Sequence, residues 1–279
     1  AASDVYKRQD QFGTGYFQET DPIRLFDDCS GYNQMAVTPA QFARMLPAAL
    51  QHAIHRREVA VVGLPGDVAA SPCAESPGAS GPLPSHGIYR PLDGELRQLA
   101  EMIGSAERIT VFCGIGAREA HDEVVRLAAM LKAPVAYTFK AKMEVQYDNP
   151  YEIGMTGLLG LPSAYGAMHE SDLLLLLGTD FPYDCFLPSE CRIAQVDIRP
   201  ERIGRRARVE LGLAGDVKET LQALFPMLRE RSDRVFLDRQ LKIYGALCDD
   251  MAAVASKRGS AGNIAPEYVA TLIDTLASD

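Results

Sequence analysis

Short, wholly apolar segments that alternate with stretches of helical periodicity constrain the fold of this 279-residue chain more than any other feature. The clearest is the run of five leucines from Leu173 to Leu177. A strand with one solvated face would alternate apolar and polar residues, so uninterrupted apolar segments predict strands that are buried on both faces. The predicted strands of this kind are Ile109–Cys113, Pro134–Tyr137, Leu173–Leu177, Ile193–Ile198 and Val209–Leu213.

Helices are predicted between these strands, because apolar residues recur there at spacings of three and four. The predicted helices cover Leu96–Ile103, Glu119–Leu131, a short stretch near Tyr165, and Val217–Glu230. Strands that are separated by helices form parallel sheets covered on both faces. We therefore expect an α/β fold, with a doubly wound, Rossmann-like parallel sheet as its central domain.

The sequence upstream of this region predicts a second, smaller unit. Pro39–Arg57 has helical spacing, although Pro47 predicts a bend or a restart within the helix. A short apolar strand, ended by turn residues, follows over Val59–Asp67. The composition then changes to Pro, Gly, Ser and Ala, which predicts a linker over residues 72–87 between two domains.

Charge and composition exclude several classes of partner. The 28 basic and 37 acidic side chains leave a net charge of −9, so no basic field exists to attract nucleic acid or an anionic lipid surface. The longest apolar run is far shorter than the roughly 20 residues that a membrane span needs. The six cysteines and five histidines are scattered, which argues against a disulfide framework and against a metal site. We expect reduced, mostly buried thiols in a cytoplasmic protein.

Ligands of an open parallel sheet bind beyond the carboxyl ends of its strands, so the turns that follow the strands are the candidate sites. Gly114 and Gly116 follow the first predicted strand and precede a predicted helix. Two glycines at such a helix start let backbone N–H groups approach a phosphate. A plain tight turn is an equally good interpretation, because the third glycine of the dinucleotide fingerprint is replaced by Glu119.

Two further turns carry polar or flat side chains. After Leu177, Thr179 offers a hydroxyl and Asp180 a carboxylate, and Phe181 or Tyr183 offers a face for an aromatic ring. An ordinary loop after a strand is an equally good interpretation of this segment. Asp197 ends a predicted strand, where a carboxylate can accept hydrogen bonds from ribose hydroxyls. It lies 83 residues after Gly114, whereas the acid of the common NAD-binding unit lies about 20 residues on, so this is not the ordinary NAD unit.

The stretch Gly154–Gly160 spaces three glycines three residues apart, at 154, 157 and 160. Bare backbone there would let a long ligand lie close, with Met155 and Leu158 covering its apolar part, and a flexible loop is the alternative. Taken together, these turns on one sheet edge predict a site for an extended dinucleotide.

Acid–base candidates are poor. The order or spacing of a Ser-His-Asp triad, of His-Glu-x-x-His and of Gly-x-Ser-x-Gly is missing from the sequence. His121 and His169 lie in helical segments, which favours surface or hydrogen-bonded structural roles. Arg205, Arg206 and Arg208 form a short basic cluster that we interpret as a solvated face, with contact to a phosphate as the alternative.

Four segments jointly resemble the thiamine-diphosphate-dependent enzymes, and most closely the pyruvate dehydrogenase (quinone) and pyruvate oxidase family. The segments are Gly15–Pro22, Leu64–Val68, Asp148–Gly157 and Gly178–Tyr183, and the similarity runs from about Gln11 to the end of the chain. The resemblance implies three α/β domains. Residues 10–71 would be the C-terminal part of the pyrimidine-binding domain, 88–258 the central FAD-binding domain, and 263–279 the start of the pyrophosphate-binding domain.

The resemblance also implies which residues contact FAD. Phe17 and Gln18 match the family's substrate-side residues near the thiamine carbon. The expected FAD contacts are Gly114, Gly116, Met155, Thr156, Gly157, Leu158, Thr179, Asp180, Phe181, Pro182, Tyr183, Asp197, Asp216 and Val217.

The sequence departs from the family in what it lacks. The family's activating glutamate would lie upstream and its Gly-Asp-Gly…Asn motif, which holds the magnesium diphosphate, downstream. We therefore expect thiamine diphosphate and Mg²⁺ only in a longer parent, and no complete catalytic set in this chain, which by itself should be inactive. The family's membrane-activated C-terminal segment is also missing, so the parent is expected in the cytoplasm, with peripheral membrane contact through that segment. Residues 1–9 are interpreted as a non-native leader.

The parent is expected to decarboxylate pyruvate oxidatively to acetate and CO2 and to pass the electrons through FAD to a quinone. An enzyme similar to acetolactate synthase or glyoxylate carboligase, in which the flavin is structural, is the alternative. A nucleotide-binding module without a redox role is a third hypothesis. The resemblance implies a homo-oligomer, a tetramer or a dimer.

Overall fold

The computed structural model describes residues 8–73, 87–257, 259 and 263–277, and its chain divides into two compact units, residues 1–87 and 88–279. Most of the predicted leader over 1–9 and of the predicted linker over 72–87 lies outside the described residues.

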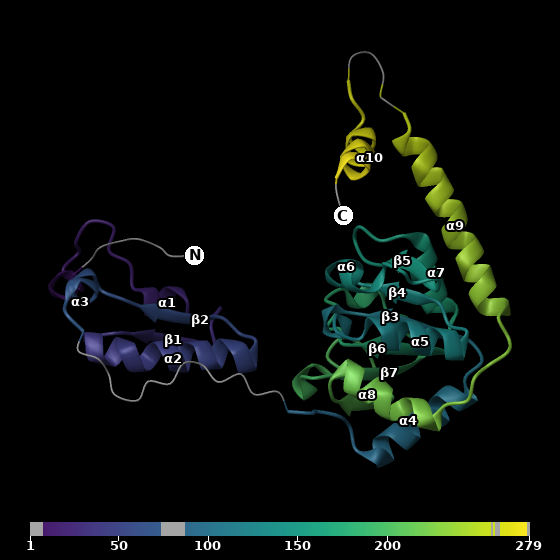
Figure 1. Cartoon of the computed structure of the whole chain (residues 1–279), viewed down its shortest axis with the longest axis horizontal. Helices are drawn as coiled ribbons and strands as arrows, with labels where there is room; N and C mark the ends of the chain where they lie inside the picture. The colour runs from purple at the N-terminus through teal and green to yellow at the C-terminus, as the bar shows by residue number, and fades with distance from the viewer. Residues whose placement is uncertain (1–7, 74–86, 258, 260–262, 278–279) are drawn as a thin grey trace. The chain divides into compact units, whose positions relative to one another are not determined.

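The first unit contains a two-stranded parallel sheet beside one long helix (Figure 1). Its elements are η1 (Gln9–Gln11), α1 (Pro22–Leu25), β1 (Tyr32–Met35), α2 (Pro39–Arg56), β2 (Ala60–Gly63) and α3 (Gly66–Ala70). The hydroxyl of Thr38 accepts from the N–H of Gln41 at 3.1 Å and caps α2, which continues through Pro47 without a restart. The predicted strand over Val59–Asp67 is shorter in the structure, because Gly66 already begins α3.

The second unit is built on a six-stranded sheet in which every neighbouring pair of strands is parallel. Its strands are β3 (Ile109–Cys113), β4 (Val135–Tyr137), β5 (Glu152–Met155), β6 (Leu173–Leu177), β7 (Arg192–Asp197) and β8 (Leu211–Ala214). The spatial order β5-β4-β3-β6-β7-β8 means that the chain moves outward from β3 to β5, returns, and continues from β6 to β8. The prediction of a doubly wound parallel sheet is confirmed, and the strand order reverses between β3 and β6.

Helices cover both faces of this sheet (Figure 1). The helices of this unit are α4 (Asp93–Ser105), α5 (His121–Leu131), α6 (Lys142–Val145), α7 (Pro162–Glu170), α8 (Val217–Leu224), α9 (Val235–Ala255) and α10 (Pro266–Leu276). Of these, α10 contacts α9, has no buried residue and is not part of the cover of the sheet. One buried cluster joins α4, α5 and α8 to the side of β6 that carries Leu173, Leu175 and Leu177. The other joins α7 and α9 to the side that carries Leu174 and Leu176. The leucine run is buried on both faces, as its sequence predicts.

Some predicted boundaries are wrong for local reasons. The helix predicted to run to Glu230 ends at Leu224, and Pro226 lies in the short helix η6 (Phe225–Met227) that follows, where it lacks the N–H of a continuing helix. The helix predicted from Glu119 begins at His121, and the strand predicted from Val209 begins at Leu211. The sequence did not predict the strands β1 and β5 or the helix α9. Polar residues and Gly154 interrupt the apolar pattern of β5. In α9 only Leu237 and Gln240 are buried, so its helical periodicity is weak.

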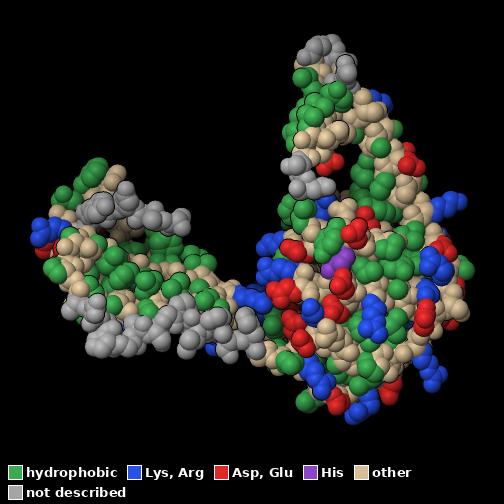
Figure 2. All heavy atoms as spheres, viewed as in Figure 1, with side chains coloured by type: hydrophobic (Ala, Val, Ile, Leu, Met, Phe, Trp, Pro, Cys, Tyr) green, Lys and Arg blue, Asp and Glu red, His purple; other side chains and the backbone are tan. Residues whose placement is uncertain are grey.

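The surface of the second unit is mixed in charge. Figure 2 shows acidic and basic side chains interspersed over the face in view. Of the six cysteines, Cys113 is buried, two are half-buried and three are exposed, so the prediction of mostly buried thiols is wrong. Within the described part of the chain, none of the helices combines the length and the apolar character that crossing a membrane requires.

Candidate functional site

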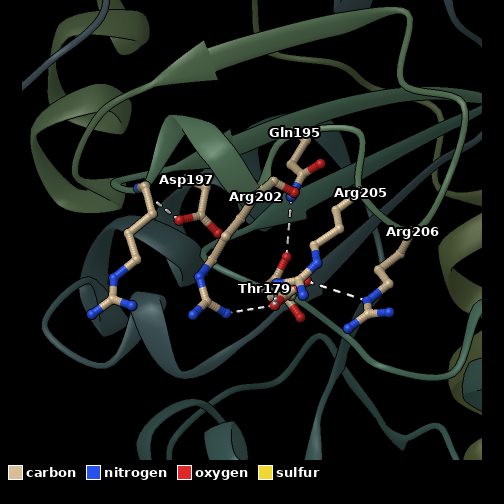
Figure 3. Close-up of polar contacts among 8 residues, drawn as sticks. Thr179, Gln195, Asp197, Arg202, Arg205 and Arg206 are labelled. Carbon is tan, nitrogen blue, oxygen red and sulfur yellow. Dashed lines mark hydrogen bonds and ion pairs between the residues drawn. The ribbon is translucent and has the colours of Figure 1, made fainter. Parts of the chain in front are cut away.

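A buried glutamine organises the carboxyl ends of β6 and β7 (Figure 3). Gln195 in β7 is 4% exposed, and its Nε2 donates to the carbonyl of Thr179 at 3.2 Å and to that of Arg202 at 3.4 Å. Its Oε1 accepts from the N–H of Gly204 at 2.9 Å. The side chain therefore fixes the turn after β6 against the segment that follows β7, which begins with the short helix η5 (Pro200–Arg202).

Three arginines of that segment converge on one carboxylate. Arg202 pairs with Oδ2 of Asp180, Arg205 Nη1 lies 3.4 Å from the same oxygen, and Arg206 Nε lies 3.4 Å from Oδ1. The Asp180 side chain is only 14% exposed. The three guanidinium groups share this one carboxylate, and Asp197 and Glu201 add negative charge nearby. The interpretation of these arginines as a solvated face holds for Arg205 and Arg208, which are exposed, whereas Arg206 is half-buried and its Nε is buried against Asp180.

Asp197 lies beside these groups, at the last position of β7. It is 6% exposed, and its Oδ1 accepts from the N–H of Arg199 at 2.9 Å. Burial raises the pKa of this carboxyl group, while the bond from Arg199 and the charge of Arg202 act in the opposite direction. Its carbonyl accepts from Gly215 at 3.0 Å, which brings the turn after β8 to the same place. The carboxylate is therefore held at the edge where the sequence predicted it.

The Gly-x-Gly turn differs from the prediction. Gly114 donates its N–H to the carbonyl of Leu177 at 2.9 Å, and Gly116 donates to that of Gly178 at 3.0 Å. A Cβ on Gly116 would lie 2.7 Å from the Cα of Gly178. The glycines thus let the turns after β3 and β6 pack together, and their two N–H groups are not open to a phosphate. A 3-10 turn at Ile115–Ala117, which contains Gly116, stands where the sequence predicted the start of an α-helix. Their contact with FAD stays a prediction.

The glycine loop after β5 reaches the turn after β6. Gly157 has φ +117°, and a Cβ there would lie 3.3 Å from the ring of Phe181. Phe181 is buried and packs edge-to-face on Phe112, so its ring is not available as a flat ligand surface. Tyr183 is 38% exposed and Leu158 is 70% exposed. Of the two predicted aromatic faces, only Tyr183 is accessible.

The remaining predicted residues fall into three groups. Thr179 and Thr156 are buried at the ends of β6 and β5, Met155 is partly buried in β5, and Pro182 is exposed. Asp216 caps α8 by accepting from the N–H of Glu219 at 3.2 Å, while the side chain of Val217 belongs to the core. Phe17, 76% exposed, and Gln18, with φ +54°, lie in the first unit.

The two histidines of the helical segments make structural contacts. His121 Nδ1 lies 3.1 Å from the carbonyl of Glu144, and its ring stacks on Tyr147. His169 Nε2 lies 3.3 Å from the carbonyl of Phe186. Neither contact places a histidine in the polar network at the ends of β6 and β7.

The sequence predicted that the turns after β3, β6 and β7 and the glycine stretch Gly154–Gly160 lie at one edge, and the contacts of these turns place them there, together with the turn after β8. It missed Gln195 and Arg202. The available signal for Gln195 was a single amide in an otherwise apolar strand, which must find partners when it is buried. Arg202 had no comparable signal, because its role depends on the path of the chain after β7.

A doubly wound sheet with a buried carboxylate and clustered arginines at its carboxyl edge defines a domain of the Rossmann-like class. Residues 96–224 match the central domain of thiamine pyrophosphate enzymes. The six-stranded sheet of the second unit is therefore similar to the central domain of these enzymes.

The chain is similar to several longer proteins. It is 46% identical over 235 residues to an uncharacterized 42.6 kDa protein in the isoamylase 3′ region of Pseudomonas amyloderamosa, covering 84% of this chain and 59% of that protein. It is 28% identical over 234 residues to pyruvate oxidase of Lactiplantibacillus plantarum, covering 79% and 38%. It is 28% identical over 282 residues to acetolactate synthase of Mycobacterium avium, covering 95% and 44%. The chain thus spans roughly two fifths to three fifths of the length of these relatives.

Proposed function

We propose that residues 88–258 bind FAD as the central domain of a longer thiamine-diphosphate-dependent enzyme that acts on pyruvate. The observation that carries the proposal is the position of Asp197. Its carboxylate ends β7 beside the arginine cluster, and an acid at the end of a parallel strand can accept hydrogen bonds from the hydroxyls of a ribose.

The residues at this edge fit such a cofactor in three respects. Asp197 supplies an acceptor for a diol, the arginines supply positive charge for a diphosphate, and Tyr183 supplies an exposed ring. The N–H groups of Gly114 and Gly116 are the exception, since both are used within the protein. FAD, when bound, supplies an acceptor for two electrons. The chain's own residues would hold it and exclude water from its inner side.

Within the family we favour oxidative decarboxylation of pyruvate to acetate and CO2, with a quinone as the electron acceptor. The segments Tyr16–Glu19 and Met155–Leu158 support this choice, and so does the similarity to a pyruvate oxidase. The activity further requires thiamine diphosphate and Mg²⁺, and we place the residues that hold them outside this chain. A homo-oligomer of the longer protein is part of the same proposal.

Acetolactate synthase chemistry is the alternative, and similarity to that enzyme supports it equally. In that case the flavin would have a structural role. Anaerobic addition of pyruvate to the full-length protein separates the two, with the flavin absorbance near 450 nm as the readout. Bleaching supports the oxidoreductase, and a flavin that stays oxidised while pyruvate is consumed supports the synthase.

The FAD site itself is tested with the 279-residue chain. Titration of FAD with the protein, followed by quenching of flavin fluorescence, should show saturable binding with one FAD per chain. Asp197→Ala should weaken this binding at least tenfold, because two hydrogen bonds to a charged acceptor are lost. No binding by a folded chain would reject the FAD site and would favour a nucleotide-binding module of another kind.

A further inference from the structure

A cluster of three arginines at the edge of the sheet is not among the FAD contacts that the family resemblance implies. Its members are Arg202, Arg205 and Arg206, from the segment that follows β7. Their side chains are 32%, 52% and 35% exposed, so the guanidinium groups lie at the rim of the edge, partly within reach of a ligand.

The cluster has more hydrogen-bond donors than its carboxylate can accept from. One carboxylate, that of Asp180, faces all three guanidinium groups. Oδ1 of Asp180 and Nε of Arg206 are buried and form an ion pair at 3.4 Å, but neither makes a hydrogen bond among the described residues. Buried polar atoms are normally hydrogen-bonded, and a lone carboxylate offers fewer acceptor sites than three guanidinium groups have donors. The arrangement suits an anion with more oxygens than a carboxylate has.

The cluster is also preorganised. Gln195 holds the backbone at Arg202 and Gly204 through buried hydrogen bonds, and the same side chain holds Thr179, the residue before Asp180 (Figure 3). The donors and the competing carboxylate are therefore fixed relative to each other. Preorganised donors bind a ligand without the loss of side-chain freedom that exposed arginines would otherwise incur.

The position of the cluster identifies the ligand chemistry. Asp197 lies next to it, because it ends the strand that carries Gln195, whose side chain holds the carbonyl of Arg202 (Figure 3). An acceptor for ribose hydroxyls beside a cluster of guanidinium groups matches a ribose that carries a phosphate. Guanidinium groups bind phosphate through two parallel hydrogen bonds.

We propose that Arg202, Arg205 and Arg206 form a phosphate subsite for the nucleotide bound at the ends of β6 and β7, and that the Asp180 carboxylate competes with the phosphate for it. The proposal rests on the proposed function and deepens it, because it assigns the phosphate end of the ligand to this segment. The carboxylate of Asp180 has to give up part of its ion pairing when a phosphate binds.

ADP and adenosine test the subsite, because they share the ribose and only ADP carries phosphate. With the 279-residue chain, calorimetry should give tighter binding of ADP than of adenosine by tenfold or more. Arg205→Gln and Arg206→Gln should each weaken ADP binding several-fold to tenfold and leave adenosine binding unchanged. Arg208→Gln is the matched control, an exposed arginine of the same segment, and should change neither. The preference for ADP should also decrease with added salt.

Asp180→Asn separates a ligand site from an ion-pair network that only stabilises the loop. Under the proposal this variant binds ADP several-fold more tightly, because the competing charge is removed. If Asp180→Asn does not fold, Arg205→Gln decides alone, since this arginine is the most exposed of the three.

The outcomes distinguish the two proposals. Equal affinity for ADP and adenosine in the wild-type chain, or equal losses for both ligands in the arginine variants, would overturn the phosphate subsite while the nucleotide site stands. A folded chain that binds none of FAD, ADP and adenosine would overturn both the phosphate subsite and the nucleotide site.

Discussion

The two halves of the sheet carry carboxylates with opposite surroundings. In the half formed by β3, β4 and β5, Glu152 accepts from the hydroxyl of Tyr137 at 2.6 Å and from that of Tyr244 at 3.0 Å, and Gln146 Nε2 lies 3.3 Å away. In the half formed by β6, β7 and β8, Asp180 faces three guanidinium groups.

The difference separates a structural network from a candidate binding site. The donors around Glu152 are neutral, and they close the network between β4, β5 and α9, so it fixes the helix to the sheet. The donors around Asp180 are charged and outnumber the acceptor sites of one carboxylate, so donors remain for a further anion. The presence of hydrogen bonds alone does not distinguish the two halves, whereas the charge and number of the donors do.

Substitution at the seam between the halves should have the largest effect. Gly178 has φ +61°, and a Cβ there would lie 2.6 Å from the Cα of Gly116. Gly178→Ala should therefore lower the free energy of unfolding by about 3 kcal/mol, from backbone strain and overpacking together. Chemical denaturation measures this.

Gly166→Ala is the control for the seam. Gly166 lies in α7, and a Cβ there would meet no atom within 4 Å. Alanine at this position should raise the free energy of unfolding by about 0.5–1 kcal/mol, because glycine is the poorer helix former. A Gly178→Ala chain as stable as the wild type would show that the two turns do not pack as described.

Removing the side-chain amide of Gln195 should have the next largest effect on stability. The effect should be confined to the half of the sheet formed by β6, β7 and β8. Gln195→Leu leaves the N–H of Gly204 and the carbonyls of Thr179 and Arg202 without this partner, which should cost about 2 kcal/mol of stability. FAD affinity should fall as well, because the arginines lose their support. Unchanged FAD affinity in a destabilised Gln195→Leu chain would reduce Gln195 to a purely structural role.

Asp197 should show a conflict between stability and binding. Its pKa is raised by burial, so the folded chain binds more protons than the unfolded chain above pH of about 4, and stability falls as the pH rises through this window. Asp197→Asn should therefore be more stable than the wild type at pH 7, and the difference should disappear at low pH, while FAD binds about tenfold more weakly. Urea unfolding between pH 4 and 8 measures the stability, and a less stable variant at pH 7 would contradict the account.

The smallest effect on stability is expected in the half of the sheet formed by β3, β4 and β5. Tyr244→Phe removes one neutral hydrogen bond to Glu152 and should cost about 1 kcal/mol without changing FAD affinity. A large loss of FAD affinity in this variant would break the distinction between the halves, because it would couple the Glu152 network to the ligand edge.

Sequence reasoning predicted the architecture better than the side-chain chemistry. The leucine run and the other apolar segments fix buried parallel strands, and parallel strands bring their following turns to one edge, so the common location of Gly114, Thr179 and Asp197 follows from the pattern. The weakly patterned elements, β5 at the sheet edge and the mostly exposed α9, carried too little periodicity to be predicted.

The site was predicted less well, because its contacts join segments that are far apart in the sequence. The Gly-x-Gly spacing is the same for a phosphate loop and for two turns that need close approach, and only the acceptors of Gly114 and Gly116 distinguish the two. Likewise, the ion pairs of Arg205 and Arg206 with Asp180 link residues that lie on different turns.

Hydrogen–deuterium exchange of the 279-residue chain with and without FAD tests most directly where the ligand binds. The account predicts slower exchange on FAD binding in residues 178–184, 198–206 and 214–217, with the loop 155–160 also protected and the region around Glu152 and α9 unchanged. Protection confined to the β3–β4–β5 half or to the first unit, with the segments after β6 and β7 unaffected, would contradict it.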